Sequence, residues 1–243
     1  MQNVKFDQIF RELKEKIETG EYPFHSSVPS ETTLTKKYGC VRNTVRRALT
    51  ELIKRGYIQS QQGKRPLVIY EPVDRNTFLI GGIESFKEAA LRNHFTPSTQ
   101  VIRFDKIIAD EQIAAKTSFP TGTKLYDVRR VRYLNGKPLI LDKNFFRMDT
   151  VGELNPEIAK QSIYEYLETE VKMKIVTSKR RMTVEPTTSE DKAWLELDDY
   201  NCLAVLSGRV FNGDGIQFEY TESRHRPDYF CFEDTAIRRK FKC

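Results

Sequence analysis

Hydrophobic residues near the start of the chain recur every three to four positions. That spacing places them on one face of a helix, which has about 3.6 residues per turn. We therefore predict an amphipathic helix over residues 5–19, with Gly20 ending it. Its buried face comprises Phe6, Ile9, Phe10, Leu13 and Ile17.

Two more helices are predicted before residue 56. Ser30 can cap the first of them with its hydroxyl, Glu31 adds negative charge at the positive end of the helix dipole, and Gly39 ends it. The next helix runs from Arg42 to Arg55. Its apolar face comprises Val45, Ala48, Leu49, Leu52 and Ile53, and its basic side comprises Arg42, Asn43, Arg46 and Arg47.

Two short strands, residues 57–60 and 67–70, then flank a basic turn that contains Lys64 and Arg65. Two helices with a tight turn between them, the second starting with Arg and Asn, are typical of a helix-turn-helix, whose second helix enters the major groove. The basic turn would be a wing beside the DNA backbone. A solvated basic surface is the simpler alternative, but the combination is more specific than any one element.

Residues 71–77 are polar, contain Pro72 and separate two patterned regions, so we interpret them as a linker. Beyond it, alternating runs predict strands at residues 100–108, 124–134, 138–147, 175–184, 202–211 and 217–225. Helices are predicted at residues 85–93, 111–117, 162–168 and 189–195. Turns such as Asn135-Gly136 favour hairpins, which indicates an α+β domain with a largely antiparallel sheet.

Charge is distributed unevenly between these regions. Residues 1–70 hold 13 Lys and Arg against 7 Asp and Glu, so they account for the whole net charge of +6. This asymmetry suggests a polyanion-binding module fused to an electrically balanced one. The chain lacks an apolar run of the roughly 18 to 20 residues that span a bilayer, and its start lacks the features of a signal peptide. We expect a cytoplasmic protein without a membrane partner.

Catalytic and metal-binding motifs are not evident in the sequence. The four Cys and three His are scattered, so no metal site is expected. Nucleophile-elbow, phosphate-loop and zinc-protease motifs are missing. A binding module without a cofactor is therefore a better interpretation than an enzyme.

Arg130 and Arg132 stand two apart in a predicted strand and so point to the same face. Two guanidinium groups on one face can hold a phosphate through several charge-assisted hydrogen bonds, although paired arginines on a strand are more often solvated. Ser162 and Tyr164 can add donors near a helix start. Acceptors for sugar hydroxyls are available on Asp142 and Glu219.

The first 70 residues resemble the winged helix-turn-helix of GntR-family transcription regulators. The resemblance rests on Pro29-Ser30-Glu31, Thr44-Val45-Arg46, Gly56-Tyr57-Ile58 and Gly63-Lys64. Val41 replaces the Ser that usually precedes the recognition helix, and Arg65-Pro66 replaces Gly-Thr in the wing. The resemblance implies a DNA-binding set of Ser30, Glu31, Arg42, Asn43, Thr44, Arg46, Arg47, Gly63, Lys64 and Arg65.

Residues 78–243 resemble the UTRA effector domain of the HutC branch of this family, whose fold is similar to chorismate lyase. The longest matching stretch runs from Tyr220 to Arg226. The resemblance implies an effector-binding set of Ser85, Phe86, Arg130, Arg132, Asp142, Ser162, Tyr164, Glu219 and His225. His225 stands where the family commonly has Tyr.

Within this branch, the motifs are most similar to those of repressors of trehalose operons. The resemblance implies a homodimer that binds a palindromic operator of trehalose uptake and utilisation genes and is released by trehalose-6-phosphate. One alternative is another phosphosugar, such as glucosamine-6-phosphate. Another is an enzyme related to chorismate lyase, but the sequence offers no candidate nucleophile or acid–base pair.

Overall fold

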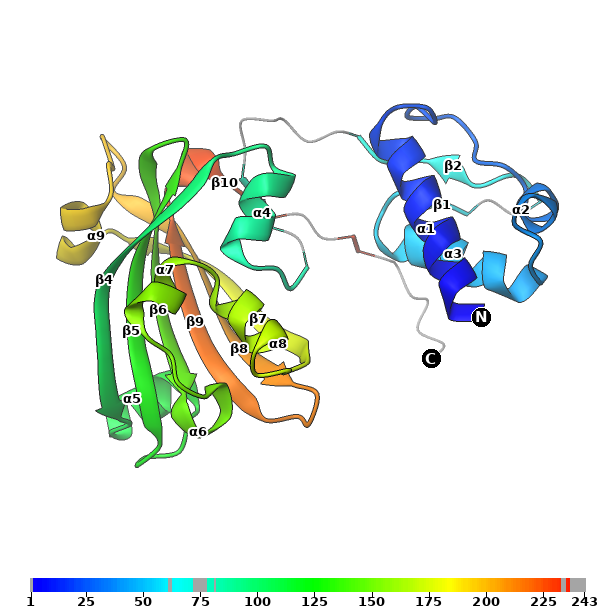
Figure 1. Ribbon diagram of the computed structural model, residues 1–243. Helices are drawn as coiled ribbons and strands as arrows, with labels where there is room; N and C mark the ends of the chain where they lie inside the picture. Colours follow the sequence, from blue (N-terminus) through cyan, green and yellow to red (C-terminus); the bar gives the residue numbers. More distant parts are fainter. Residues whose placement is uncertain (1, 61–62, 72–77, 81, 233–234, 237–243) are drawn as a thin grey trace, which may run out of the picture. The chain divides into compact units, whose positions relative to one another are not determined.

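The computed structural model describes residues 2–60, 63–71, 78–80, 82–232 and 235–236 (Figure 1). The chain divides into two compact units, one containing the described residues up to 71 together with residues 235–236, and the other those from 78 to 232. Apart from Glu71, the predicted linker at residues 71–77 lies outside the described residues.

The first unit has the predicted order of three helices and two strands. These elements are α1 (Gln2–Glu18), α2 (Glu31–Tyr38), α3 (Arg42–Lys54), β1 (Ile58–Gln59) and its antiparallel partner β2 (Leu67–Val68). The apolar stripe of α1 packs on that of α3, and Leu34 and Val68 close the same core. The backbone N–H of Thr33 donates to the Ser30 hydroxyl at 3.2 Å, so the predicted cap of α2 is present.

The second unit is built on a six-stranded sheet in the order β4-β5-β6-β9-β8-β7, in which every neighbouring pair is antiparallel. This confirms the predicted α+β class. The strands are β4 (Pro97–Ile108), β5 (Lys124–Leu134), β6 (Lys137–Arg147), β7 (Ile175–Pro186), β8 (Cys202–Asn212) and β9 (Gln217–His225). A separate parallel pair joins β3 (Phe78–Ile80) and β10 (Phe230–Phe232).

Short helices cover both faces of the sheet (Figure 1). They are α4 (Phe86–Arg92), α5 (Glu111–Thr117), α6 (Met148–Val151), α7 (Pro156–Lys160), α8 (Ile163–Thr169), α9 (Ser189–Trp194) and the 3-10 helix η1 (Pro227–Tyr229). Val128 and Phe146 pack beneath α6, α7 and α8 on one face. On the other face, Val131 and Leu141 pack against the residues that follow α9. Because side chains alternate along a strand, β5 and β6 supply both cores.

Candidate functional site

The start of α3 carries four exposed polar residues of the predicted DNA-binding set, Arg42, Asn43, Arg46 and Arg47. In α2, Glu31 accepts hydrogen bonds from the Nε–H of Arg42 at 2.7 Å and from that of Arg46 at 3.1 Å. The bond from Arg42 and the neighbouring Arg46 hold the pKa of Glu31 below its ordinary value. Glu31 therefore fixes the two guanidinium groups relative to α2, and the side chains of both arginines remain more than half exposed.

Three residues near the start of α3 differ in their surroundings. Val41 takes the N-cap position and makes no side-chain cap bond, as its apolar side chain requires. The guanidinium of Arg47 lies 5.0 Å from the centroid of the Phe6 ring. Thr44 is only 4% exposed. It packs on the core side of α3, so we assign it to the core and not to the DNA-facing set.

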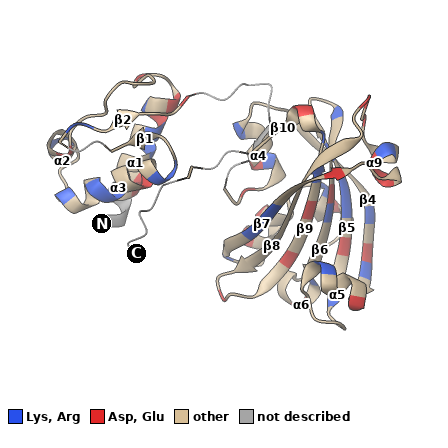
Figure 2. Cartoon of the chain, turned by 180° about the vertical axis from the view of Figure 1, so that it is seen from behind, with Lys and Arg blue, Asp and Glu red and all other residues tan. Residues whose placement is uncertain are grey.

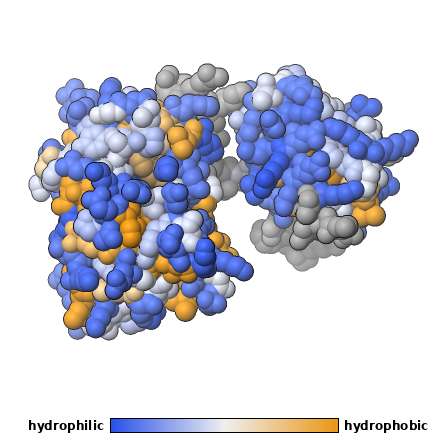
Figure 3. Space-filling model, viewed as in Figure 1, coloured by the Kyte–Doolittle hydropathy of each residue, from blue (hydrophilic) through white to orange (hydrophobic). Residues whose placement is uncertain are grey.

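The predicted wing residues Gly63, Lys64 and Arg65 are exposed in the turn before β2. Gly63 has a φ of +71°, a left-handed conformation that favours glycine. Lys and Arg residues outnumber acidic ones on α3, whereas α1 and the strands of the second unit carry both signs (Figure 2). The visible face of the first unit is mainly hydrophilic (Figure 3). Such a surface suits a polyanion better than an apolar partner.

A cavity of about 160 Å³ lies in the second unit, on the α8 side of the sheet. It gathers side chains from α4, β5, β6, α8 and β9, which are far apart in the sequence. Every member of the predicted effector-binding set lines it: Ser85, Phe86, Arg130, Arg132, Asp142, Ser162, Tyr164, Glu219 and His225.

Ser85 and Ser162 each cap a helix at the cavity wall. The Ser85 hydroxyl accepts from the backbone N–H of Glu88, and the Ser162 hydroxyl accepts from that of Glu165, both at 3.2 Å. Capping fixes both serines, and each hydroxyl keeps its own hydrogen for donation. The two residues are thus rigid parts of the lining.

Arg132 is held by an internal ion pair. Its Nε–H donates to Asp142 at 2.7 Å, its Nη1–H donates to Thr99 at 2.8 Å, and its guanidinium lies 4.9 Å from the Phe86 ring centroid. The other oxygen of Asp142 accepts from Ser223 at 2.6 Å. Burial alone would raise the pKa of Asp142, but the positive charges of Arg132 and Arg130 outweigh it and hold that pKa below its usual value.

Arg130 is equally buried, at 4% exposed, but its hydrogen bonds go only to neutral acceptors. It donates to the backbone oxygen of Ala159 at 3.3 Å and to Oδ1 of Asn144 at 2.8 Å. Among the described residues, its Nε–H has no acceptor. Burial and the charge of Arg132 lower the pKa of Arg130, although a guanidinium stays protonated at neutral pH. A buried cation bonded only to neutral groups favours an anionic partner.

Glu219 and Tyr164 form the opposite side of this cluster. The Tyr164 hydroxyl donates to one carboxyl oxygen of Glu219 at 2.7 Å, and Asn144 donates to the other at 2.9 Å. Burial raises the pKa of Glu219 to about 7. Burial also lowers the pKa of His225 to about 4, so its imidazole is neutral at pH 7. The cluster therefore offers neutral and acidic groups that suit hydroxyls, beside two cations that suit an anion.

Polar residues outside the predicted set also line the cavity, among them Asn144, Arg180, Thr221 and Ser223. Three of them stand at two-residue steps from predicted members of the set on β6 and β9. Strand alternation therefore already places these three on the same face as Asp142 and Glu219. Arg180 comes from the edge strand β7, and its position depends on the sheet order.

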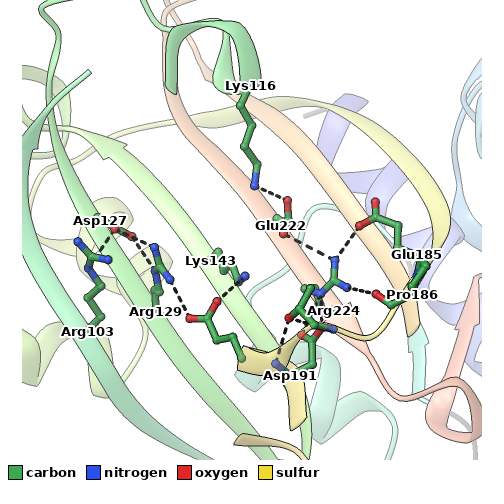
Figure 4. Close-up of polar contacts among 12 residues, drawn as sticks. Arg103, Lys116, Asp127, Arg129, Lys143, Glu185, Pro186, Asp191, Glu222 and Arg224 are labelled. Carbon is green, nitrogen blue, oxygen red and sulfur yellow. Dashed lines mark hydrogen bonds and ion pairs between the residues drawn. The ribbon is translucent and has the colours of Figure 1, made fainter. Parts of the chain in front are cut away.

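The face of the sheet away from the cavity carries a network of ion pairs (Figure 4). Buried Arg224 bonds to Asp191 at 2.9 Å and to Glu185 at 2.7 Å, and Glu190 pairs with Arg129 at 2.8 Å. Side chains of the stretch from Tyr220 to Arg226 therefore point to both faces of the sheet. Ser223 and His225 line the cavity, and Arg224 belongs to the network. The network's charges satisfy one another, so we assign it a structural role.

The described residues hold no group of three or more His, Cys, Asp or Glu side chains placed to bind a metal ion. In that same part of the chain, no helix is long and apolar enough to cross a membrane. The remaining candidates are the basic helix of the first unit and the polar cavity of the second.

A winged helix-turn-helix joined to a unit with a buried polar cavity defines a ligand-responsive DNA-binding regulator. Comparison with known families agrees with this class. Residues 5–68 match the bacterial regulatory proteins of the gntR family, and residues 92–231 match the UTRA domain. The chain therefore belongs to the GntR family of transcriptional regulators and carries a UTRA effector domain.

Individual relatives support the same assignment. The transcriptional regulator TreR of Bacillus subtilis is 37% identical over 236 residues, covering 97% of this chain and 98% of TreR. The mannosyl-D-glycerate system repressor MngR of Escherichia coli is 26% identical over 234 residues, covering 96% of each chain. These relatives are regulators of transcription and not enzymes, which argues against the alternative of a chorismate lyase-like activity.

Solved structures agree in fold. The effector-binding domain of the B. subtilis trehalose repressor TreR has 37% identity and a TM-score of 0.54, and covers 59% of this chain and 99% of its own. The possible regulator YydK of B. subtilis has a TM-score of 0.79 over 96% of this chain and 99% of its own, at 22% identity. The likeness to YydK concerns the fold alone.

Proposed function

We propose that this protein is a cytoplasmic homodimeric repressor of trehalose uptake and utilisation genes that trehalose-6-phosphate releases from a palindromic operator. The observation that carries the ligand proposal is Arg130, a buried cation bonded only to neutral acceptors inside a cavity of polar side chains. A phosphate monoester would bind Arg130 and Arg132, and sugar hydroxyls would face Glu219 and His225. The 37% identity to TreR favours trehalose as the sugar.

DNA recognition is proposed for the exposed start of α3 in each subunit. Arg42, Asn43, Arg46 and Arg47 would contact base edges and phosphates in the major groove, while Lys64 and Arg65 follow the backbone. A two-fold dimer requires half-sites about one helical turn apart. The effector must bind the DNA-incompetent conformation more tightly, because equal affinity for both conformations shifts nothing.

The test is release of the full-length protein from DNA. A binding site is first selected from random duplex DNA, and the complex is then followed by fluorescence anisotropy during titration with trehalose-6-phosphate, trehalose or glucosamine-6-phosphate. We expect a palindromic site and release by trehalose-6-phosphate alone. Release by glucosamine-6-phosphate instead would keep the repressor and change its sugar, and no release by any phosphosugar would contradict the proposal.

Two arginine variants locate the effector within the protein. Arg130→Ala should bind the selected DNA normally and lose its response to effector, because Arg130 lines the cavity and not the DNA-binding unit. Arg129→Ala is the matched control, since Arg129 is the preceding residue and pairs with Glu190 on the opposite face. Equal responses of both variants would remove Arg130 from the site.

A further inference from the structure

Asn144 lies at the centre of the polar cluster in the cavity and is 2% exposed. Its Oδ1 accepts from Nη2–H of Arg130 at 2.8 Å. Its Nδ2 donates to Glu219 at 2.9 Å and to the hydroxyl of Thr221 at 2.9 Å. One amide thus joins strands β5, β6 and β9 and separates a guanidinium from a carboxyl group.

The orientation of this amide follows from its partners. A guanidinium only donates hydrogen bonds, and a carboxylate only accepts them. Rotating the amide of Asn144 by half a turn would set N–H against N–H at Arg130 and oxygen against oxygen at Glu219. The observed orientation is therefore the one that satisfies all three neighbours, and Asn144 can connect the cation to the acid without carrying charge.

The neighbouring arginine provides an internal comparison. Arg132 and Asp142 form a buried ion pair at 2.7 Å. Arg130 stands two residues before Arg132 on β5, and Asn144 stands two residues after Asp142 on β6, so both pairs lie on one face. One arginine is neutralised by a carboxylate, and the other is only positioned by an amide.

We propose that Asn144 is a specificity-determining residue of the cavity: its uncharged amide positions Arg130 without neutralising it, and so reserves that guanidinium for an anionic group of the ligand. This inference rests on the proposed function of the cavity as a phosphosugar site. It assigns Asn144 a positioning role that acts through Arg130. A carboxylate at position 144 would pair with Arg130, as Asp142 pairs with Arg132, and would compete with the phosphate.

Two substitutions separate this charge effect from simple damage to the cavity. Asn144→Asp keeps the shape and an acceptor for Arg130, but it adds a negative charge and, like the rotated amide, sets an oxygen against Glu219. Asn144→Ala removes the hydrogen bonds and adds none. If Asn144 were merely structural, ligand binding would fall in step with the thermal stability of each variant. The charge argument predicts that Asn144→Asp binds more weakly than its thermal stability accounts for.

The experiment is calorimetric titration of the full-length protein and its variants with trehalose-6-phosphate at pH 8, with glucosamine-6-phosphate as a second probe. Asn144→Asp should bind the probe at least about tenfold more weakly than Asn144→Ala, because a carboxylate would occupy the charge-assisted bonds of Arg130. Thermal unfolding without ligand checks that each variant is folded. Asn201→Asp is the matched control: it adds the same charge at an exposed residue and should bind within about twofold of the unaltered protein.

The outcomes separate the two proposals. If the unaltered protein binds the phosphosugar and Asn144→Asp binds it as well as Asn144→Ala does, the role of Asn144 is overturned while the proposed function stands. If the unaltered protein binds neither phosphosugar, the proposed function fails and the role of Asn144 falls with it. If Asn144→Asp binds the phosphosugar more weakly than both the unaltered protein and Asn144→Ala, the result supports the role of Asn144 and the proposed function.

Discussion

Replacement of Glu219 by glutamine tests whether the cavity controls the ionisation of this carboxyl group. Glu219 is 3% exposed and accepts hydrogen bonds from Tyr164 at 2.7 Å and Asn144 at 2.9 Å. Burial outweighs these bonds and the nearby Arg130, and it raises the pKa of Glu219 from 4.5 to about 7. Glutamine is close to glutamate in size and keeps one acceptor oxygen, but it replaces the other oxygen with an N–H donor and cannot ionise.

The magnitude follows from that change in pKa. A group whose pKa is higher in the folded state binds more protons there, so the stability it contributes is present at low pH and is lost as pH rises toward 7. Each pKa unit corresponds to about 1.36 kcal/mol. Ionised Glu219 should therefore lower the free energy of unfolding by about 3 kcal/mol at pH 8 and by less than about 1 kcal/mol at pH 5.

Urea unfolding at pH 5 and pH 8, without ligand, measures this effect. Trp194 is the single Trp of the chain and lies in the second unit, so its fluorescence reports unfolding there. The pKa of His225 is lowered to about 4, so its contribution to the stability of the protein has the opposite pH dependence and is lost as pH falls. Its contribution is common to both proteins and cancels when Glu219→Gln is compared with the unaltered chain.

We expect Glu219→Gln to exceed the unaltered protein in free energy of unfolding by a margin that grows by about 2 to 3 kcal/mol between pH 5 and pH 8. Glu168→Gln is the control, because it removes an exposed carboxyl group from α8 and should match the unaltered chain at both pH values. A margin for Glu219→Gln that does not change with pH would refute the argument from burial.

Three other substitutions probe the DNA-binding helix, the cap of α2 and the ion-pair network. Arg46→Ala should weaken binding to the selected DNA by about 1 to 3 kcal/mol in anisotropy titrations, and unchanged affinity in the folded variant would exclude Arg46 from recognition. Ser30→Ala removes the cap of α2 and should cost about 1 kcal/mol in urea unfolding followed by circular dichroism; no loss would mean that the cap contributes nothing. Asp191→Ala leaves buried Arg224 without one of its carboxylates and should cost about 3 to 5 kcal/mol by Trp194 fluorescence, whereas an unaltered midpoint would contradict the structural role of the network.

Much of the fold follows from hydrophobic periodicity. The apolar stripes of α1 and α3 are long enough to predict both helices, and alternation predicts all six strands of the large sheet within a few residues. The short elements β3 and β10 were missed because three residues carry no detectable period. Their parallel pairing also joins segments about 150 residues apart, which no local pattern encodes.

The residues of the candidate sites were likewise predictable from the sequence only in part. Alternation correctly places Arg130 and Arg132 on one face, but the lining of the cavity by residues of α4 and α8 depends on tertiary packing. Ser162 and Tyr164 at α8 were proposed from their place near a helix start, whereas Ser85 and Phe86 were predicted by resemblance alone. Thr44 was assigned to DNA although it stands four residues before buried Ala48, a spacing that puts it on the core face of α3. Asn144 stands two residues after Asp142 on β6, so alternation places it on the same face, but its uncharged amide gives no charge pattern that marks a binding site.

Calorimetry can decide whether the cavity binds a phosphorylated sugar through its buried arginines. The full-length protein is titrated with trehalose-6-phosphate, with unphosphorylated trehalose as the control, and the titration is repeated with the Arg130→Ala, Arg132→Ala double variant. We predict saturable binding of the phosphorylated sugar alone and its loss in the double variant. Equal binding of trehalose, or undiminished binding by the folded double variant, would show that the buried arginines do not hold a phosphate.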